Sequence, residues 1–367
     1  GGKSNLTDSI KNIFTIYNPD VIAINTTCLS ETIGDDIPSI IAAAEKEIPE
    51  GKVVFHANTP SYVGSHITGF SNMVKSMVRT FTKPKATDNG KINLIPGFVN
   101  PGDMREIKTL LKTMSVPFVM FPDTSGVVDT AMTGKYEMFS KGGTTIDELK
   151  ETGDSMATFA LGKWASEEAS NDIEKKAKVK SIVLKTPIGV KATDEFLMAV
   201  SEITGKAISP EIEEERGQLV DVLTDTHFHF HGKKVAIFGD PDIVGMKPVH
   251  VLTGTAGAAI EATLNEMLTE AGVKANVKAW GDLFTLHQWI KNEPVDLILG
   301  NTYGKFIAKA EDTPLVRIGF PVLDRSVHSY MPIVGYKGAL RLVEMISGAL
   351  LDRADRDAKD EDLELVM

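Results

Sequence analysis

Apolar residues recur at helical spacing at the start of the chain and then form a short continuous run. A helix over 6–17 is predicted by the apolar positions Leu6, Ile10, Ile13, Phe14 and Tyr17. Asn18-Pro19-Asp20 ends this helix, and the unbroken run Val21–Ile24 is typical of a buried strand. The chain therefore opens with a helix followed by a strand.

The same alternation continues along the whole chain. Further strands are predicted over 52–56, 92–95, 118–121, 234–238, 249–252, 277–280, 297–299 and 316–318. Helices are predicted between them over 36–45, 66–81, 101–114, 193–204, 210–225 and 336–351, with a helix start at 144–149. Strands that alternate with helices predict an α/β fold with mainly parallel sheets flanked by helices. Much of 150–200 has no clear pattern.

The length of 367 residues exceeds one ordinary core and predicts two or three domains. The strand–helix order restarts twice, and residues 83–90 form a polar linker. We place the domains at 1–90, 91–205 and 206–367.

The connection between the strands that end at Phe238 and begin at Val249 is unusually short. Parallel neighbours need a crossover of about a dozen residues or more, usually a helix. The intervening segment is shorter and includes the turn Gly239–Asp242. Either these strands are not parallel neighbours or a helix is missing from the sequence, and we favour the missing helix.

Composition narrows the class of protein. A net charge of −11 argues against nucleic acid as a partner, which requires a clustered basic face. No apolar run approaches the roughly 20 residues that span a bilayer. A single cysteine excludes an internal disulfide framework and favours a reducing, cytoplasmic setting. The first residues, Gly1-Gly2-Lys3, indicate the interior of a longer chain.

Cys28 is the first candidate for chemistry because it follows a strand directly. An inert, buried cysteine is the common alternative. Its flanks, Thr26 to Thr32, predict a polar turn at the carboxyl end of a strand, where open α/β sheets bind ligands. A nucleophilic thiolate lacks a nearby histidine, whereas a metal or iron–sulfur cluster would need thiolates from elsewhere.

Several other polar residues can be interpreted either as structural or as functional. Gly34-Asp35-Asp36 can cap the next helix or form an acidic docking patch, and Ser61 can be a turn hydroxyl or part of a site. Asp221 and Asp225 share one helix face and are exposed acids or ligands of a hard cation. The alternating histidines 227, 229 and 231 could bind zinc from a strand, but a helix end is favoured.

Two glycine-containing turns invite a nucleotide interpretation. Gly239–Asp242 lacks the G-x-G-x-x-G spacing, and Thr253–Gly257 lacks the Gly-Lys-Ser/Thr of a phosphate loop. Both are therefore predicted to be structural turns, and ATP binding is not expected.

Several motifs together resemble one family. The motifs occur in order over most of the chain: Thr26–Asp36, Asn58–His66, Thr193–Phe196, Glu215–Gly217, Gly239–Asp242, Asn301–Phe306 and Arg317–Pro321. In this order they resemble the beta chains of nitrogenase molybdenum–iron proteins, especially the shorter clostridial type. The resemblance implies three Rossmann-like domains, the nitrogenase component 1 fold.

The resemblance also implies a function and partners. It implies a cytoplasmic α2β2 oxidoreductase for nitrogen fixation, in which an [8Fe-7S] P-cluster at the interface with the alpha chain relays electrons to an iron–molybdenum cofactor held by that alpha chain. Cys28 corresponds to a cluster thiolate and Ser61 to the serine that can bind the oxidised cluster. The resemblance implies that the ATP-dependent iron protein docks near Ile33, Gly34, Asp35 and Asp36. Asp221 and Asp225 correspond to a cation site shared with a second beta chain.

The sequence also departs from the family pattern. Two further cluster cysteines precede the corresponding Gly-Gly in family members, and a helix follows Gly239–Asp242 there. The competing hypotheses are a cofactor-assembly scaffold of the same superfamily and a metal-free small-molecule-binding Rossmann protein. A vanadium or iron-only relative is a further alternative.

Overall fold

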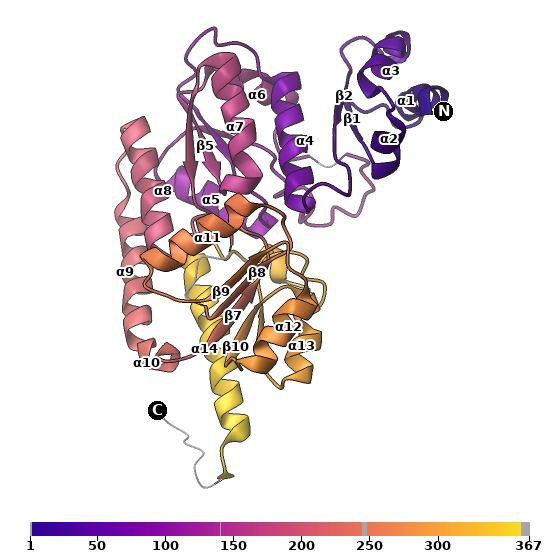
Figure 1. Ribbon diagram of the computed structural model, residues 1–367. Coiled ribbons are helices and arrows are strands. Elements are labelled where there is room, and N and C mark those ends of the chain that lie inside the picture. Colours follow the sequence, from indigo (N-terminus) through magenta and orange to yellow (C-terminus); the bar gives the residue numbers. More distant parts are fainter. Residues whose placement is uncertain (1, 140, 244–247, 361–367) are drawn as a thin grey trace. The chain divides into compact units, whose positions relative to one another are not determined.

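The computed structural model describes residues 2–139, 141–243 and 248–360, which divide into two compact units (Figure 1). Unit 1 comprises Gly1–Phe98 and Pro117–Leu184, and unit 2 comprises Val99–Val116 and Lys185–Met367. The division into three domains remains a prediction. None of the described helices combines the length and apolarity needed to cross a membrane.

Unit 1 contains two parallel sheets. The first pairs β1 (Val21–Asn25) with β2 (Val53–Ala57), and the second has the order β4-β3-β5-β6. The strands of the second sheet are β3 (Ile92–Ile95), β4 (Phe118–Met120), β5 (Ala157–Leu161) and β6 (Lys180–Leu184). Both β3 and β5 are buried along their whole length, as expected for strands that are covered on both faces.

The helices of unit 1, apart from the short helix Cys28–Ile33, bury apolar residues in its core. They are α1 (Gly2–Tyr17), α2 (Cys28–Ile33), α3 (Ile37–Ala43), α4 (His66–Phe81), α6 (Ile146–Glu151) and α7 (Lys163–Ala177), with 3-10 turns η1 (Glu45–Glu47) and η2 (Thr152–Asp154). Ile10 and Phe14 of α1 pack on Ile22 of β1. In α4, Val74 and Val78 pack in one cluster with Phe55 of β2, which holds the first sheet in place.

Unit 2 contains a five-stranded parallel sheet of order β11-β10-β7-β8-β9. Its strands are β7 (Val235–Phe238), β8 (His250–Thr253), β9 (Asn276–Ala279), β10 (Leu297–Gly300) and β11 (Leu315–Arg317). Its helices are α5 (Pro101–Thr113), α8 (Gly189–Thr204), α9 (Pro210–Asp225), α10 (His227–Phe230), α11 (Ala258–Glu270), α12 (Leu283–Asn292), α13 (Lys305–Ala310) and α14 (Gly335–Asp357), with η3 (Thr302–Gly304) and η4 (His328–Tyr330). Figure 1 shows α12 and α13 over one face of this sheet, where Leu286 and Ile307 join its core.

The predicted α/β class with parallel sheets is confirmed. The sequence interpretation nevertheless missed β5, α7 and β6 in the region without a clear pattern, and it also missed α11, α12 and α13. The polar turn predicted around Cys28 is wrong, because Cys28–Ile33 form a short helix.

The short connection after β7 joins two neighbouring parallel strands, β7 and β8. Because Ala236 pairs with His250 in a parallel register, the alternative that the two strands are not parallel neighbours is wrong. The missing helix stays a prediction, and residues 244–247 of the connection lie outside the described residues.

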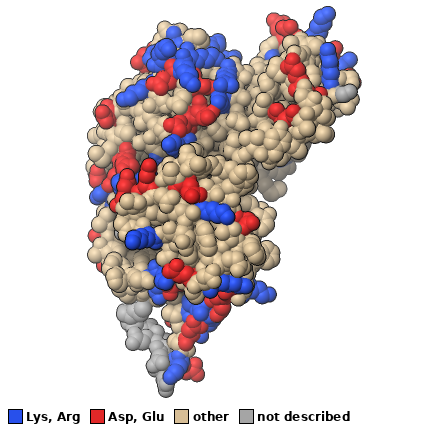
Figure 2. Space-filling view, viewed as in Figure 1, with Lys and Arg blue, Asp and Glu red and all other residues tan. Residues whose placement is uncertain are grey.

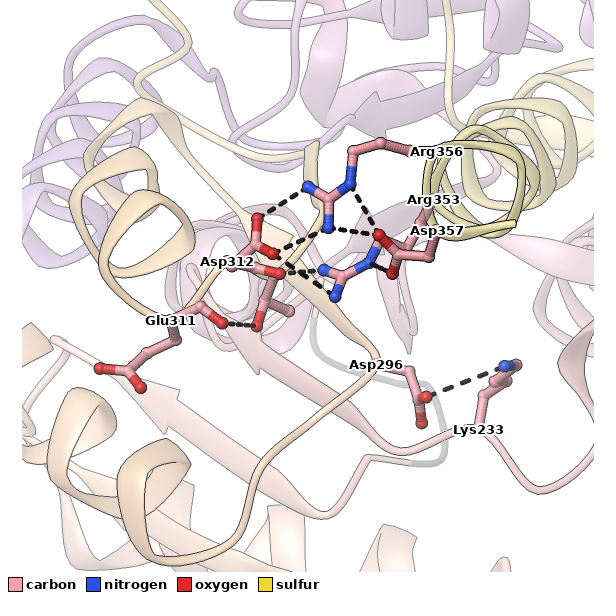
Figure 3. Close-up of polar contacts among 8 residues, drawn as sticks. Lys233, Asp296, Glu311, Asp312, Arg353, Arg356 and Asp357 are labelled. Carbon is pink, nitrogen blue, oxygen red and sulfur yellow. Dashed lines mark hydrogen bonds and ion pairs between the residues drawn. The ribbon is translucent and has the colours of Figure 1, made fainter. Parts of the chain in front are cut away.

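Ion pairs join elements within each unit. Figure 3 shows Arg356 of α14 facing Asp312 in the turn after α13, with Nη1–Oδ1 and Nη2–Oδ2 distances of 2.7 and 2.8 Å. Arg353 also contacts Asp312 and Asp357. On the face seen in Figure 2, acidic and basic side chains lie interspersed. Such exposed pairs fix the helix end but contribute little stability individually.

Two glycines on α14 provide a matched test of its packing. A Cβ at Gly338 would lie 2.4 Å from the carbonyl carbon of Ile333, whereas a Cβ at Gly348 meets nothing within 4 Å. We expect Gly338→Ala to lower the free energy of unfolding by about 3 kcal/mol. Gly348→Ala should raise it by about 0.5–1 kcal/mol through helix propensity. Thermal unfolding of both variants measures this, and equal effects would contradict the packing of α14.

Burial of Glu106 on α5 should make the free energy of unfolding depend on pH. Its side chain is 8% exposed, and its Oε1 has no hydrogen-bond partner among the described residues. Burial, reinforced by the charge of Glu215, raises the pKa of Glu106 to about 6. This folded-state pKa exceeds the unfolded value. The contribution of the protonated Glu106 to the free energy of unfolding is therefore fully present below about pH 4.5 and is lost as the pH rises through about 6.

Glu106→Gln should therefore raise the free energy of unfolding at pH 7.5 by about 2 kcal/mol. The difference from the parent should shrink towards zero near pH 4.5. Melting temperatures at several pH values measure it, with the exposed Glu344→Gln on α14 as control. A pH-independent difference would show that Glu106 does not titrate in this range.

Candidate functional site

The candidate site lies at the carboxyl ends of β1 and β2. These strands are parallel and in register, with Val21 opposite Val53 and Asn25 opposite Ala57. The pairing is extended by one bond from Thr26 N to Ala57 O at 3.2 Å. The segments that carry Cys28 and Ser61 therefore leave neighbouring strands at the same edge of the sheet, the usual position of ligands in open α/β folds.

Hydrogen bonds of Thr26 and Thr59 join the two segments. Thr59 N donates to Thr26 Oγ1 at 2.8 Å, and Thr59 Oγ1 donates to the Thr26 carbonyl at 2.8 Å. Thr26 Oγ1 in turn donates to Glu31 Oε1 at 2.5 Å. Thr26 is 7% exposed, so these bonds are shielded from water. The sequence interpretation did not predict this linkage, although a threonine stands two residues before both Cys28 and Ser61.

Cys28 is the first residue of α2, and it is a free, exposed cysteine. The start of the helix is stabilised because Ser30 Oγ accepts from Thr27 N and donates to the Thr27 carbonyl, both at 3.0 Å. Thr32 Oγ1 donates to the Cys28 carbonyl at 2.7 Å. The thiol therefore lies at the start of a short helix that side-chain hydrogen bonds hold in place, and the alternative that Cys28 is buried is wrong.

Large apolar side chains are exposed on the segments that carry Cys28 and Ser61. Four large side chains on α2 and on the segment after β2 are more than half exposed: Leu29, Ile33, Tyr62 and Val63. Contiguous exposed apolar side chains are typical of interaction surfaces. Ser61 itself is exposed between them.

The segment Ile33–Asp36 connects α2 with α3. Gly34 adopts a left-handed conformation (φ 76°) that ends α2. Asp36 caps α3 by accepting from Ser39 N at 3.2 Å and from Ser39 Oγ at 2.5 Å, and these bonds lower the pKa of its carboxyl. The capping interpretation is therefore confirmed for Asp36, while Asp35 is half-buried.

The other metal candidates lie in unit 2. Asp221 and Asp225 are exposed on α9, as their spacing predicted. Within the described residues, no group of three or more histidine, cysteine, aspartate or glutamate side chains could hold a metal ion. His227 and His229 belong to α10, so the zinc-binding strand is excluded and the predicted helix end is confirmed.

Comparison with known proteins gives the family. A family model described as nitrogenase component 1 type oxidoreductase matches residues 1–351. The nitrogenase molybdenum–iron protein beta chain of Clostridium pasteurianum is 54% identical over 379 residues, covering 100% of this chain and 83% of the relative. The homologue of Azotobacter vinelandii is 37% identical, covering 98% and 74%. The solved structure of nitrogenase Cp1 at pH 6.5 has a TM-score of 0.98 at 54% identity, covering 100% of this chain and 83% of that one.

The matched family model places the chain in a class of oxidoreductases. The chain belongs to the nitrogenase component 1 family. The prediction of a nitrogenase beta-type chain is thereby confirmed. The alignment with the clostridial relative spans 379 positions against 367 residues here, so at least 12 positions of that relative lack a counterpart.

Proposed function

We propose that this chain is the beta subunit of a nitrogenase molybdenum–iron protein and contributes Cys28 and Ser61 to a cluster shared with an alpha chain. The observation that carries the proposal is the hydrogen-bonded pairing of the two segments at one sheet edge. The exposed apolar side chains around them support a protein partner at this surface. The names of the two relatives described above, both molybdenum–iron protein beta chains, agree with it.

The residues present fit one side of a shared iron–sulfur cluster. Cys28 offers an exposed sulfur ligand, and Ser61 offers an oxygen ligand on the neighbouring segment. Since an [8Fe-7S] cluster needs several thiolates, the remaining ligands must come from outside the described residues. When bound, the cluster would carry electrons towards the iron–molybdenum cofactor of the alpha chain. This chain's residues would orient the ligands and exclude water through the apolar side chains.

The proposed assembly has further surfaces. Asp221 and Asp225 would supply two carboxylates to a cation between this chain and a second beta chain. Ile33, Gly34, Asp35 and Asp36 would face the ATP-dependent iron protein. The proposed location of the complex is the cytoplasm, which keeps clusters and thiols reduced.

Asp35 and Asp36 allow a test of iron-protein docking. Asn also caps helices, so Asp36→Asn removes the charge and keeps the cap of α3, while Asp35→Asn removes a charge next to that cap. Each should weaken docking roughly two- to fivefold at low salt and less at high salt. Turnover measured against iron-protein concentration at several ionic strengths checks this. Asp88→Asn, in another exposed turn of unit 1, is the control. If the dependence of turnover on iron-protein concentration is unchanged in all variants, Asp36 is a helix cap only.

Analysis of iron and acid-labile sulfide in the native assembly tests the proposed function. The proposal expects both in the purified complex of this chain with its alpha partner, together with acetylene reduction when the iron protein is added. Clusters without turnover would favour the assembly-scaffold hypothesis. The absence of both iron and sulfide would reject a cluster-bearing subunit and favour the metal-free binder.

A further inference from the structure

The hydroxyl of Thr26 occupies the junction between the two proposed ligand segments. It accepts from Thr59 N at 2.8 Å and donates to Glu31 Oε1 at 2.5 Å. Glu31 belongs to α2, the helix that begins at Cys28, while Thr59 stands two residues before Ser61. One buried hydroxyl therefore connects the cysteine helix to the serine segment.

These contacts are more than is needed to hold either segment alone. The helix α2 is already closed by the Thr27–Ser30 bonds at its start and by Gly34 at its end. The segment after β2 has its own anchor, because Asn72 Nδ2 of α4 donates to the Asn58 carbonyl at 2.9 Å. The bonds of Thr26 and Glu31 act between the segments instead, and they restrict how Cys28 moves relative to Ser61.

We propose that Thr26 and Glu31 are positioning residues that fix the Cys28 helix against the Ser61 segment and thereby tune a cluster held by both. This inference rests on the proposed function. A buried hydroxyl that both accepts and donates loses two bonds at once when it is removed. Outer hydrogen bonds of this kind orient metal ligands and shift the potential of the group that they hold.

Thr26→Val tests the inference, because valine has the shape of threonine without its hydroxyl. In the assembled complex with its alpha partner, we expect a shifted P-cluster midpoint potential and an altered electron paramagnetic resonance spectrum, at a normal iron content. Thr26→Ser restores the hydroxyl and should restore both signals. Thr80→Val is the matched control, since among the described residues its hydroxyl bonds to the Ser76 carbonyl within α4 and joins no second segment.

Glu31→Leu provides a second route if the Thr26→Val complex does not accumulate. It removes the acceptor of the Thr26 hydroxyl but leaves the bond from Thr59 N intact. A shifted potential in Glu31→Leu, absent from Glu31→Gln, would support the inference. Unchanged potentials and spectra in these variants, with only a lowered melting temperature, would overturn it. Loss of iron from the parent complex itself would instead contradict the proposed function.

Discussion

Replacing Cys28 with alanine is expected to abolish electron delivery in the assembled complex. Removing an outer-shell partner of a metal ligand typically lowers metal affinity or activity by about 10–100-fold. Loss of a direct ligand should therefore lower turnover by more than about 100-fold. Iron content and cluster spectra should change in parallel. The fold should persist, because the Cys28 side chain is exposed and α2 is held by other residues.

Cys28→Ser separates the sulfur from the shape of the side chain. Serine has nearly the same size as cysteine and is also polar, but it lacks the sulfur. A defect that Cys28→Ala and Cys28→Ser share is therefore caused by loss of the thiolate. The quantities to measure are iron per complex, the cluster spectra and acetylene reduction. Normal values in Cys28→Ala would remove this residue from the ligand set.

Replacing Asp103 with alanine is expected to cause the largest loss of stability. Asp103 is 2% exposed and accepts from Ile333 N at 2.7 Å, Val334 N at 3.3 Å and Asn100 N at 3.0 Å. It thereby joins the start of α5 to the residues before α14. Removing the carboxylate leaves three backbone donors without this acceptor, which should lower the free energy of unfolding by on the order of 3 to 5 kcal/mol.

The exposed cap Asp282 is the matched control for Asp103. It caps α12 by accepting from Thr285 N at 2.8 Å, but water can replace it. Asp282→Ala should therefore cost only about 1 kcal/mol. Denaturant unfolding of the two variants distinguishes them. Equal losses would show that the buried position of Asp103 contributes nothing beyond ordinary helix capping.

Strongly periodic segments were predictable from the sequence. The predicted bounds of α4 and α9 match the structure, and β1 and β2 lie within one residue of prediction at each end. In these segments the spacing of the apolar residues follows from burial of one face of a helix or of a whole strand, so the pattern can be recognised in the sequence. The position of Cys28 and Ser61 at strand ends followed from the same pattern.

The missed elements have identifiable causes. The inward face of α7 is built from small residues such as Ala165, Ser166 and Ala169, which gives no strong apolar stripe. In α11 the buried residues Ile260, Leu264 and Leu268 do recur at helical spacing, so that signal was present and overlooked.

The contacts of the candidate site could not be predicted in the same way. The Thr26–Thr59 bonds depend on the register of two strands, and the three bonds of Asp103 join residues far apart in the chain. Residue type alone indicates only that such groups can accept or donate. Likewise, the helix at Cys28 begins with the side-chain bonds between Ser30 and the N-cap Thr27, which residue type alone does not reveal.

The most direct test of the account is anomalous X-ray diffraction at the iron edge on crystals of the complex with its alpha partner. The account predicts a cluster of iron atoms with one iron bonded to Cys28 Sγ, beside the segment that carries Ser61. A free Cys28 thiol with no iron near it, in a complex that contains its full iron elsewhere, would contradict the account.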